Sequence, residues 1–147
     1  MRTLPVSLLA LLAAAPSIAQ VKAGELTIKD PVMRAVAPGV ANTAGYLTVA
    51  NAGAKPDKLL SAACACARSV EIHLSHVMDG TAMMMPSSPV EVPAGGQVSF
   101  APGGYHLMVV GLKAPLSDGG VQTLTLKFQH GGTVMVPFQV RAKIVSR

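Results

Sequence analysis

Apolar and polar residues alternate along most of this chain, in short runs rich in valine, leucine and threonine. Because successive side chains of an extended strand point to opposite faces, this period of two predicts half-buried β-strands. Segments such as APGG and SDGG separate the runs and are typical of turns. We expect strands over residues 25–36, 44–53, 57–64, 68–74, 89–100, 105–112, 121–129 and 133–145.

No apolar stripe with the period of an α-helix is long enough to predict a stable helix. Short strands at this spacing are instead typical of an all-β sandwich or a Greek-key barrel. A hairpin turn is predicted at Gly131-Gly132, between the last two strands. Because the chain shows neither a linker nor a repeat, residues 20–147 are predicted to form a single all-β domain.

The first nineteen residues have the pattern of an export signal. A positively charged start precedes the apolar stretch LPVSLLALLAAA, and Ser17 and Ala19 supply small side chains before a cut at Gln20. The apolar stretch is shorter than the roughly 20 residues of a membrane span. We therefore expect residues 1–19 to be a cleaved signal peptide and the protein to be exported, without stable membrane insertion.

Charge and composition argue against two broad classes of function. The net charge of +5 comes from basic residues that are scattered singly, and only two tyrosines and three phenylalanines are present. Nucleic acid is not an expected partner, because its binding uses clustered basic residues and aromatic rings for stacking. The chain also lacks a Gly-x-Ser-x-Gly elbow and a glycine-rich phosphate loop, so we predict that it is not an enzyme.

Methionine and histidine are concentrated in two segments. Four of the eight methionines fall within residues 78–85, and two histidines come shortly before them. In the predicted strand at 105–112, His106 and Met108 share a face because they are two residues apart. A lone His-x-Met pair is more often ordinary packing, but imidazole nitrogen together with thioether sulfur is a donor set that favours Cu(I).

The spacing of four of these residues resembles that of a known family. His73, ten residues, Met84, twenty-one residues and then His106-x-Met108 match the His-x10-Met-x21-His-x-Met pattern of the periplasmic PCu(A)C copper chaperones. The segments AGYLTVANAG, DGTAMMMP, PGGYHLMVVGLK and HGGTVMV are also similar to that family. The similarity covers nearly the whole chain after the predicted signal.

This resemblance implies a cupredoxin-like Greek-key β-sandwich that binds Cu(I) through His73, Met84, His106 and Met108. It also implies delivery of copper to the copper centre of a respiratory oxidase, or to another copper carrier. Two imidazoles and two thioethers form a neutral ligand set, which suits a monovalent ion better than Cu(II), the second oxidation state considered. Such ligands exchange more readily than buried thiolates.

Four further residues are auxiliary candidates for copper contact. His76 and Met78 are expected in a loop after the strand of His73, with a plain solvent-exposed position as the alternative for His76. Cys64 and Cys66 are predicted to form a strained or redox-active disulfide after export, with inert thiols or a metal site as alternatives. The disulfide requires a local bend, because Cα atoms two apart in a straight strand lie near the upper limit for a bridge.

Three neighbours of the predicted ligands have simpler expected roles. Met83 and Met85 flank Met84 in the chain, so in an extended segment they point away from it and are expected to pack. Glu71 shares the strand face of His73 and is a candidate for orienting its imidazole ring, with an exposed carboxylate as the alternative.

Two other functions fit parts of the sequence. A blue-copper electron carrier would share the implied fold, but its site needs a cysteine thiolate beside two histidines. Cys64 and Cys66 both precede every histidine in the chain, and neither is near His106. A sandwich that binds no metal would instead use its methionines as a contact patch.

Overall fold

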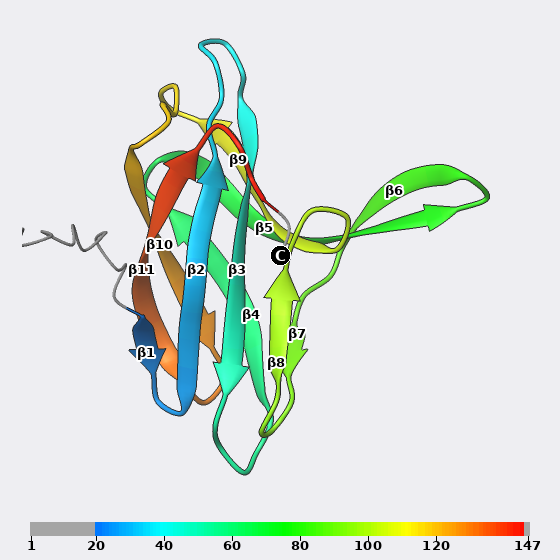
Figure 1. Ribbon diagram of the computed structural model, residues 1–147, viewed down its shortest axis with the longest axis vertical. Helices are drawn as coiled ribbons and strands as arrows, with labels where there is room; N and C mark the ends of the chain where they lie inside the picture. Colours follow the sequence, from blue (N-terminus) through cyan, green and yellow to red (C-terminus); the bar gives the residue numbers. More distant parts are fainter. Residues whose placement is uncertain (1–19, 146–147) are drawn as a thin grey trace, which may run out of the picture.

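The computed structural model describes residues 20–145, which form strands and turns but no helix (Figure 1). The predicted signal peptide, residues 1–19, lies outside this range. The expectation of an all-β chain is confirmed. The strands are β1 (Val21–Ala23), β2 (Leu26–Arg34), β3 (Asn42–Asn51), β4 (Asp57–Cys64), β5 (Ala67–Met78), β6 (Thr81–Pro86), β7 (Val90–Val92), β8 (Gln97–Phe100), β9 (Tyr105–Leu112), β10 (Val121–Phe128) and β11 (Gly132–Arg141).

Seven of the strands pair side by side in the order β2, β11, β10, β4, β5, β9, β3, and β3 pairs again with β2. This pairing closes the sheet into a barrel-like sandwich, so each of the seven strands pairs with a neighbour on both sides. Within the ring β11 and β2 run parallel, whereas the other neighbours are antiparallel. The remaining strands β1, β6, β7 and β8 pair with β2, β5, β4 and β3. Among residues 20–145 there is no helix long and apolar enough to span a membrane.

The core is built from the inward-facing residues of the alternating strands. Leu107 and Val109 of β9 are completely buried, and so is Phe138 of β11. Gly45 of β3 makes room for that ring, since a Cβ atom here would lie 3.4 Å from Phe138 and 3.6 Å from the Cβ of Leu107. The absence of a side chain at Gly45 thus lets β3, β9 and β11 pack closely. Burial of each large apolar side chain contributes about 1.5–3 kcal/mol.

The structure differs from the sequence-based prediction in two segments, the predicted strand at 89–100 and the predicted loop around His76 and Met78. The predicted strand at 89–100 is divided into β7 and β8, because Pro93 to Gly96 form a turn. The prediction of a loop around His76 and Met78 was wrong, because β5 continues to Met78 and pairs with β6. All residues of β6 are exposed, so the strand lacks the alternation by which half-buried strands are recognised.

A two-residue turn joins β5 to β6. Asp79 and Gly80 both have positive φ angles, of 51° and 76°. Asp-Gly favours this left-handed geometry, which matches the twist of a tight hairpin. Figure 1 shows the resulting β5–β6 hairpin projecting from the barrel.

A buried carboxylate joins the start of β4 to the turn between β10 and β11. Asp57 is only 5% exposed and accepts hydrogen bonds from the backbone N–H groups of Lys58 (2.7 Å), His130 (2.9 Å) and Gly131 (2.8 Å). Burial alone would raise the pKa of Asp57, but these three N–H groups and the nearby His130 charge lower it further than burial raises it. The net pKa of Asp57 is therefore below its ordinary value.

We expect Asp57→Asn to lower the free energy of unfolding by about 1–3 kcal/mol at neutral pH, because the amide NH2 would face a buried N–H group. A carboxylate whose pKa is lower in the folded state stabilises the protein above its unfolded pKa of about 3.9. That stabilisation is lost as the pH falls through the folded pKa. Urea unfolding should therefore show a gap between wild type and variant that is full at neutral pH and narrows in acid. A gap of constant size would contradict this role of the charge.

Candidate metal centre

Two histidines face each other across β5 and β9. His73 lies directly opposite His106 in the antiparallel register. Their ring centroids are 5.8 Å apart, and the rings meet edge to face at 65°. The two residues are far apart in sequence, so the pairing of β5 with β9 is what brings the imidazoles together.

The same register decides which other side chains share this face of the sheet. Glu71 lies opposite Met108, and both are two residues from a member of the histidine pair, so all four side chains point to one side. On the other flank of β5, Met84 of β6 is opposite Ser75 and is a diagonal neighbour of His73. Diagonal neighbours are about 7–8 Å apart, within reach of long side chains. We call this side, with His73, Met84, His106 and Met108, the front face.

His106 presents a shielded nitrogen on the front face. Its side chain is 4% exposed, and its Nδ1 donates a hydrogen bond to the backbone oxygen of Gly104 at 3.1 Å. Because a carbonyl oxygen only accepts, this contact places the proton on Nδ1 and leaves a lone pair on Nε2. Nε2 is buried and has no hydrogen-bond partner. An unsatisfied buried polar atom costs about 1–3 kcal/mol, which a bound metal ion would offset.

His73 presents a second such nitrogen. Its Nε2 is 2.7 Å from Oε2 of Glu71, while its Nδ1 is buried and has no partner. Since the carboxylate accepts a proton from Nε2, the lone pair of the neutral ring is on Nδ1. A carboxylate that holds one ring nitrogen while the other binds metal is a common arrangement. Of the two alternatives for Glu71, the structure shows the contact with His73, made by a carboxylate that is also half exposed.

The two methionines of the front face differ in exposure. Met108 is half-buried in β9, whereas Met84 on the projecting hairpin is 60% exposed. Ser75 donates its backbone N–H to Gly104 at 3.0 Å, and beyond this bond β5 continues with β6 alone. One thioether is thus part of the barrel and the other is carried by the hairpin.

The composition of the front face limits which ions it can hold. Among residues 20–145 no group of three or more histidine, cysteine, aspartate or glutamate side chains is arranged to hold a metal ion. An ion between His73 and His106 would therefore need thioether ligands to complete its coordination. Thioether sulfur suits soft Cu(I), whereas zinc sites use cysteine, histidine and carboxylate.

The cysteine pair is separate from the front face. Cys64 and Cys66 form a disulfide across the turn between β4 and β5, with Cα atoms 5.1 Å apart. The predicted disulfide and the bend it requires are both present. From Ala67 to His73 the strand extends about 20 Å at 3.3 Å per residue. In this form the cysteines have no thiolate to offer an ion at the front face.

His76 and Met78 lie on the opposite side of the hairpin from Met84. They alternate along β5 with His73 and Ser75, so their side chains point to the other face. Met83 and Met85 lie on that side as well, pointing away from the front face as expected. His76 and Met78 therefore do not join the front face, and an auxiliary copper contact by either residue stays a prediction.

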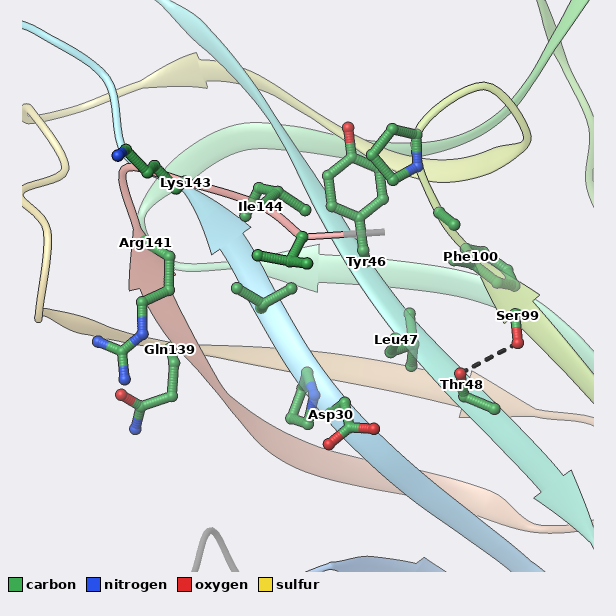
Figure 2. A pocket seen from close by; sticks show the side chains of 15 residues that line it. Asp30, Tyr46, Leu47, Thr48, Ser99, Phe100, Gln139, Arg141, Lys143 and Ile144 are labelled. Carbon is green, nitrogen blue, oxygen red and sulfur yellow. Dashed lines mark hydrogen bonds between the residues drawn. The ribbon is translucent and has the colours of Figure 1, made fainter. Parts of the chain in front are cut away.

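A hollow of about 360 Å³ lies on another part of the barrel, beside β2, β3 and β8 (Figure 2). Tyr46, Leu47 and Phe100 line it, together with Ile144 from the segment after β11. None of its lining residues is a histidine, methionine or cysteine. This hollow therefore offers no imidazole or sulfur donor to a copper ion.

Comparison with known sequences identifies relatives of the chain. Residues 26–140 match the profile of the family described as "Putative lipoprotein LpqE-like". The "Putative lipoprotein Lxx21020" of Leifsonia xyli subsp. xyli is 35% identical over 106 residues, which are 71% of this chain and 64% of that relative. The chain thus spans less than two thirds of the length of this curated relative.

Solved structures with the same fold include the copper-bound PCuAC domain from PmoF2, with a TM-score of 0.74 and 26% identity over 86% of this chain and 100% of that one. The solution structure of apo-DR1885 from Deinococcus radiodurans has a TM-score of 0.64 and 32% identity, covering 99% of both chains. The CuI-DR1885 structure has a TM-score of 0.61 and 31% identity, covering 82% of this chain and 80% of that one. The expected cupredoxin-like β fold is confirmed.

Proposed function

The chain belongs to the LpqE-like family, and on this premise we propose that it is a periplasmic copper chaperone that carries Cu(I) on its front face. The proposed ligand atoms are Nδ1 of His73, Nε2 of His106 and the sulfurs of Met84 and Met108. The observation that carries the proposal is the pair of facing imidazoles, each with a buried nitrogen that has no partner. The copper-bound neighbours from PmoF2 and Deinococcus radiodurans support copper as the cargo.

The charge of the ligand set favours Cu(I) over Cu(II). Both imidazoles bind as neutral rings and both thioethers are uncharged, so a monovalent ion leaves only one positive charge at the site. Glu71 contacts His73 at 2.7 Å and provides a negative charge next to that ligand. It would keep the ring in the tautomer that binds through Nδ1.

The unequal exposure of the ligands supports a role in transfer. His106 is nearly buried, whereas Met84 is 60% exposed on the projecting hairpin. An acceptor can therefore replace the Met84 thioether first and reach the imidazoles afterwards. We propose that the acceptor is the copper centre of a respiratory oxidase or another copper carrier. The role is that of a carrier and not of an enzyme.

Export is part of this proposal. We propose that residues 1–19 are a cleaved signal peptide and that residues 20–147 form the copper-binding domain. The Cys64–Cys66 disulfide supports an oxidising compartment, since such bonds persist there and are rare in the cytosol. The description of the family as a lipoprotein also supports export. With both cysteines bonded to each other, a blue-copper carrier would lack its thiolate ligand.

Replacing Met108 with leucine tests the proposed site. The two side chains have similar apolar volume, so the free energy of unfolding of the apo protein should change by less than about 1.5 kcal/mol. Loss of a thioether ligand should lower Cu(I) affinity by about tenfold or more, which is about 1.4 kcal/mol of binding free energy. A competition titration against a Cu(I) chelator and a urea unfolding curve measure the two effects.

The matched control is Met135→Leu, because Met135 is 67% exposed on β11, which β10 and β4 separate from β5 in the ring of strands. This variant should bind Cu(I) as the wild type does. Equal affinities of the Met108 and Met135 variants would remove Met108 from the ligand set.

A further inference from the structure

The back face of the β5–β6 hairpin carries a second group of soft donors. His76 lies directly opposite Met83, so their side chains share a face with Cβ atoms about 4.5–5.5 Å apart. Met78 and Met85 are each two residues from a member of this pair and point to the same side. We call these four residues, none of which is a proposed front-face ligand, the back-face cluster.

The methionines of this cluster do not fill the core. Met78, Met83 and Met85 are 54%, 46% and 48% exposed. They lie on the projecting β5–β6 hairpin (Figure 1), and within residues 20–145 β6 is the only strand that pairs with β5 beyond Ser75. Single exposed apolar residues are common on protein surfaces, but three half-exposed methionines on one face of a hairpin form a patch. Such a patch indicates a contact or binding site.

The imidazole of His76 provides a second and independent observation. Its Nδ1 is buried and has no hydrogen-bond partner, as in His73 and His106. In the described part of the chain, three imidazole rings have a buried nitrogen without a hydrogen-bond partner. Each of them lies beside a methionine of the β5–β6 hairpin or of β9. The free nitrogen of a neutral imidazole can accept a hydrogen bond or bind a metal ion. Because Nδ1 of His76 has no hydrogen-bond partner, a bound metal ion would supply the contact that it lacks.

The local charge also favours a cation. The protein as a whole carries a net charge of +5, but residues 69–90 contain no lysine or arginine. Asp79 lies in the turn that joins the two strands, next to Met78. A cation at the back face would therefore have no basic residue on the hairpin to repel it.

We propose that the back-face cluster is a second Cu(I) site, with His76 and Met83 as its central ligands and Met78 and Met85 as flanking thioethers. The inference rests on the proposed function, since it takes Cu(I) as the cargo. The site should bind Cu(I) more weakly than the front face, because it has one imidazole instead of two and its thioethers are about half exposed. It would place an exchangeable ion on the outermost part of the protein, where another carrier can reach it before the front face.

Counting bound ions tests the second site. Apo protein is titrated with Cu(I) in the absence of oxygen and examined by native mass spectrometry. Wild type should bind two ions, His76→Gln/Met83→Leu should bind one, and Met135→Leu should bind two. The replaced side chains lie on the surface of the hairpin, so unchanged melting temperatures of the apo proteins verify the fold.

A front-face variant separates this proposal from the proposed function. His106→Ala/Met108→Leu should lose the tighter ion and keep the weaker one. Labelling the methionine methyl groups with carbon-13 should show Met84 and Met108 shifting with the first equivalent and Met83 with the second. One ion in wild type, or two in the back-face variant, would overturn the second site and leave the front face standing. A front-face variant that kept the tighter ion would overturn the proposed function instead.

Discussion

His106→Ala should lower the affinity for Cu(I) by about 100-fold or more. Removing a residue that only supports a metal ligand typically costs 10–100-fold in affinity, and His106 is proposed as a ligand itself. Its Nε2 is buried and has no other partner, so no second group is present to take its place. A 100-fold loss corresponds to about 2.7 kcal/mol of binding free energy. A chelator competition titration under reducing conditions measures it.

His106→Asn is the matched control for this prediction. The asparagine amide can still donate to the backbone oxygen of Gly104, as Nδ1 of His106 does, but it offers nothing in the position of Nε2. Both variants should therefore lose Cu(I) affinity, while the asparagine variant keeps more of the stability. Wild-type affinity in the asparagine variant would exclude Nε2 as a ligand.

The effects of His106 and Met108 on binding should not be additive. If both residues hold the same ion, the double variant loses less affinity than the sum of the single variants. If the two residues held separate ions, the losses of affinity in the single variants would add up in the double variant. The double variant thus indicates whether the two residues act as one centre.

Leu107→Ala, in contrast to His106→Ala, should affect folding more than Cu(I) binding. It should lower the free energy of unfolding by about 2–5 kcal/mol. Leu107 is completely buried, and its Cβ lies close to Gly45, where the Phe138 ring also packs. Truncation leaves a cavity that this crowded layer cannot easily close. Cu(I) affinity should change by less than about tenfold, because the ligands point to the other side of β9. Urea unfolding of the apo protein measures the loss.

The two neighbouring substitutions in β9 therefore separate binding from folding. A loss of stability below about 1 kcal/mol for Leu107→Ala would contradict its place in the core. A loss of Cu(I) affinity as large as that of His106→Ala would mean that the site depends on the core behind it more than the strand geometry suggests.

Strands with one buried face could be predicted from the sequence. In β9, buried Leu107 and Val109 alternate with outward-facing residues, so a local pattern of period two was sufficient. β6 could not be found in this way, because neither of its faces is buried and its residues do not alternate. The Asp79-Gly80 pair was the available signal for its hairpin, and it would also have placed His76 opposite Met83.

The candidate site was only partly accessible to sequence reasoning. That His106 and Met108 share a face follows from their spacing alone. The choice of His73 and Met84 as their companions came from the resemblance to a copper-chaperone family, and their role as ligands stays a proposal. The contact between Glu71 and His73 was anticipated as an option, because both residues lie on one face of β5.

By itself the sequence determined the all-β class, the faces of the half-buried strands and the soft chemistry of the donors, because these depend on residue type and on local periodicity. Only the tertiary structure decided that His73 faces His106, that Met84 lies diagonal to His73 and that His76 lies on the reverse side. Register is a non-local property, set by closing the ring with every apolar face inward. A shift of one residue between β5 and β9 would turn the ligands of one strand to the opposite face and separate the two imidazoles.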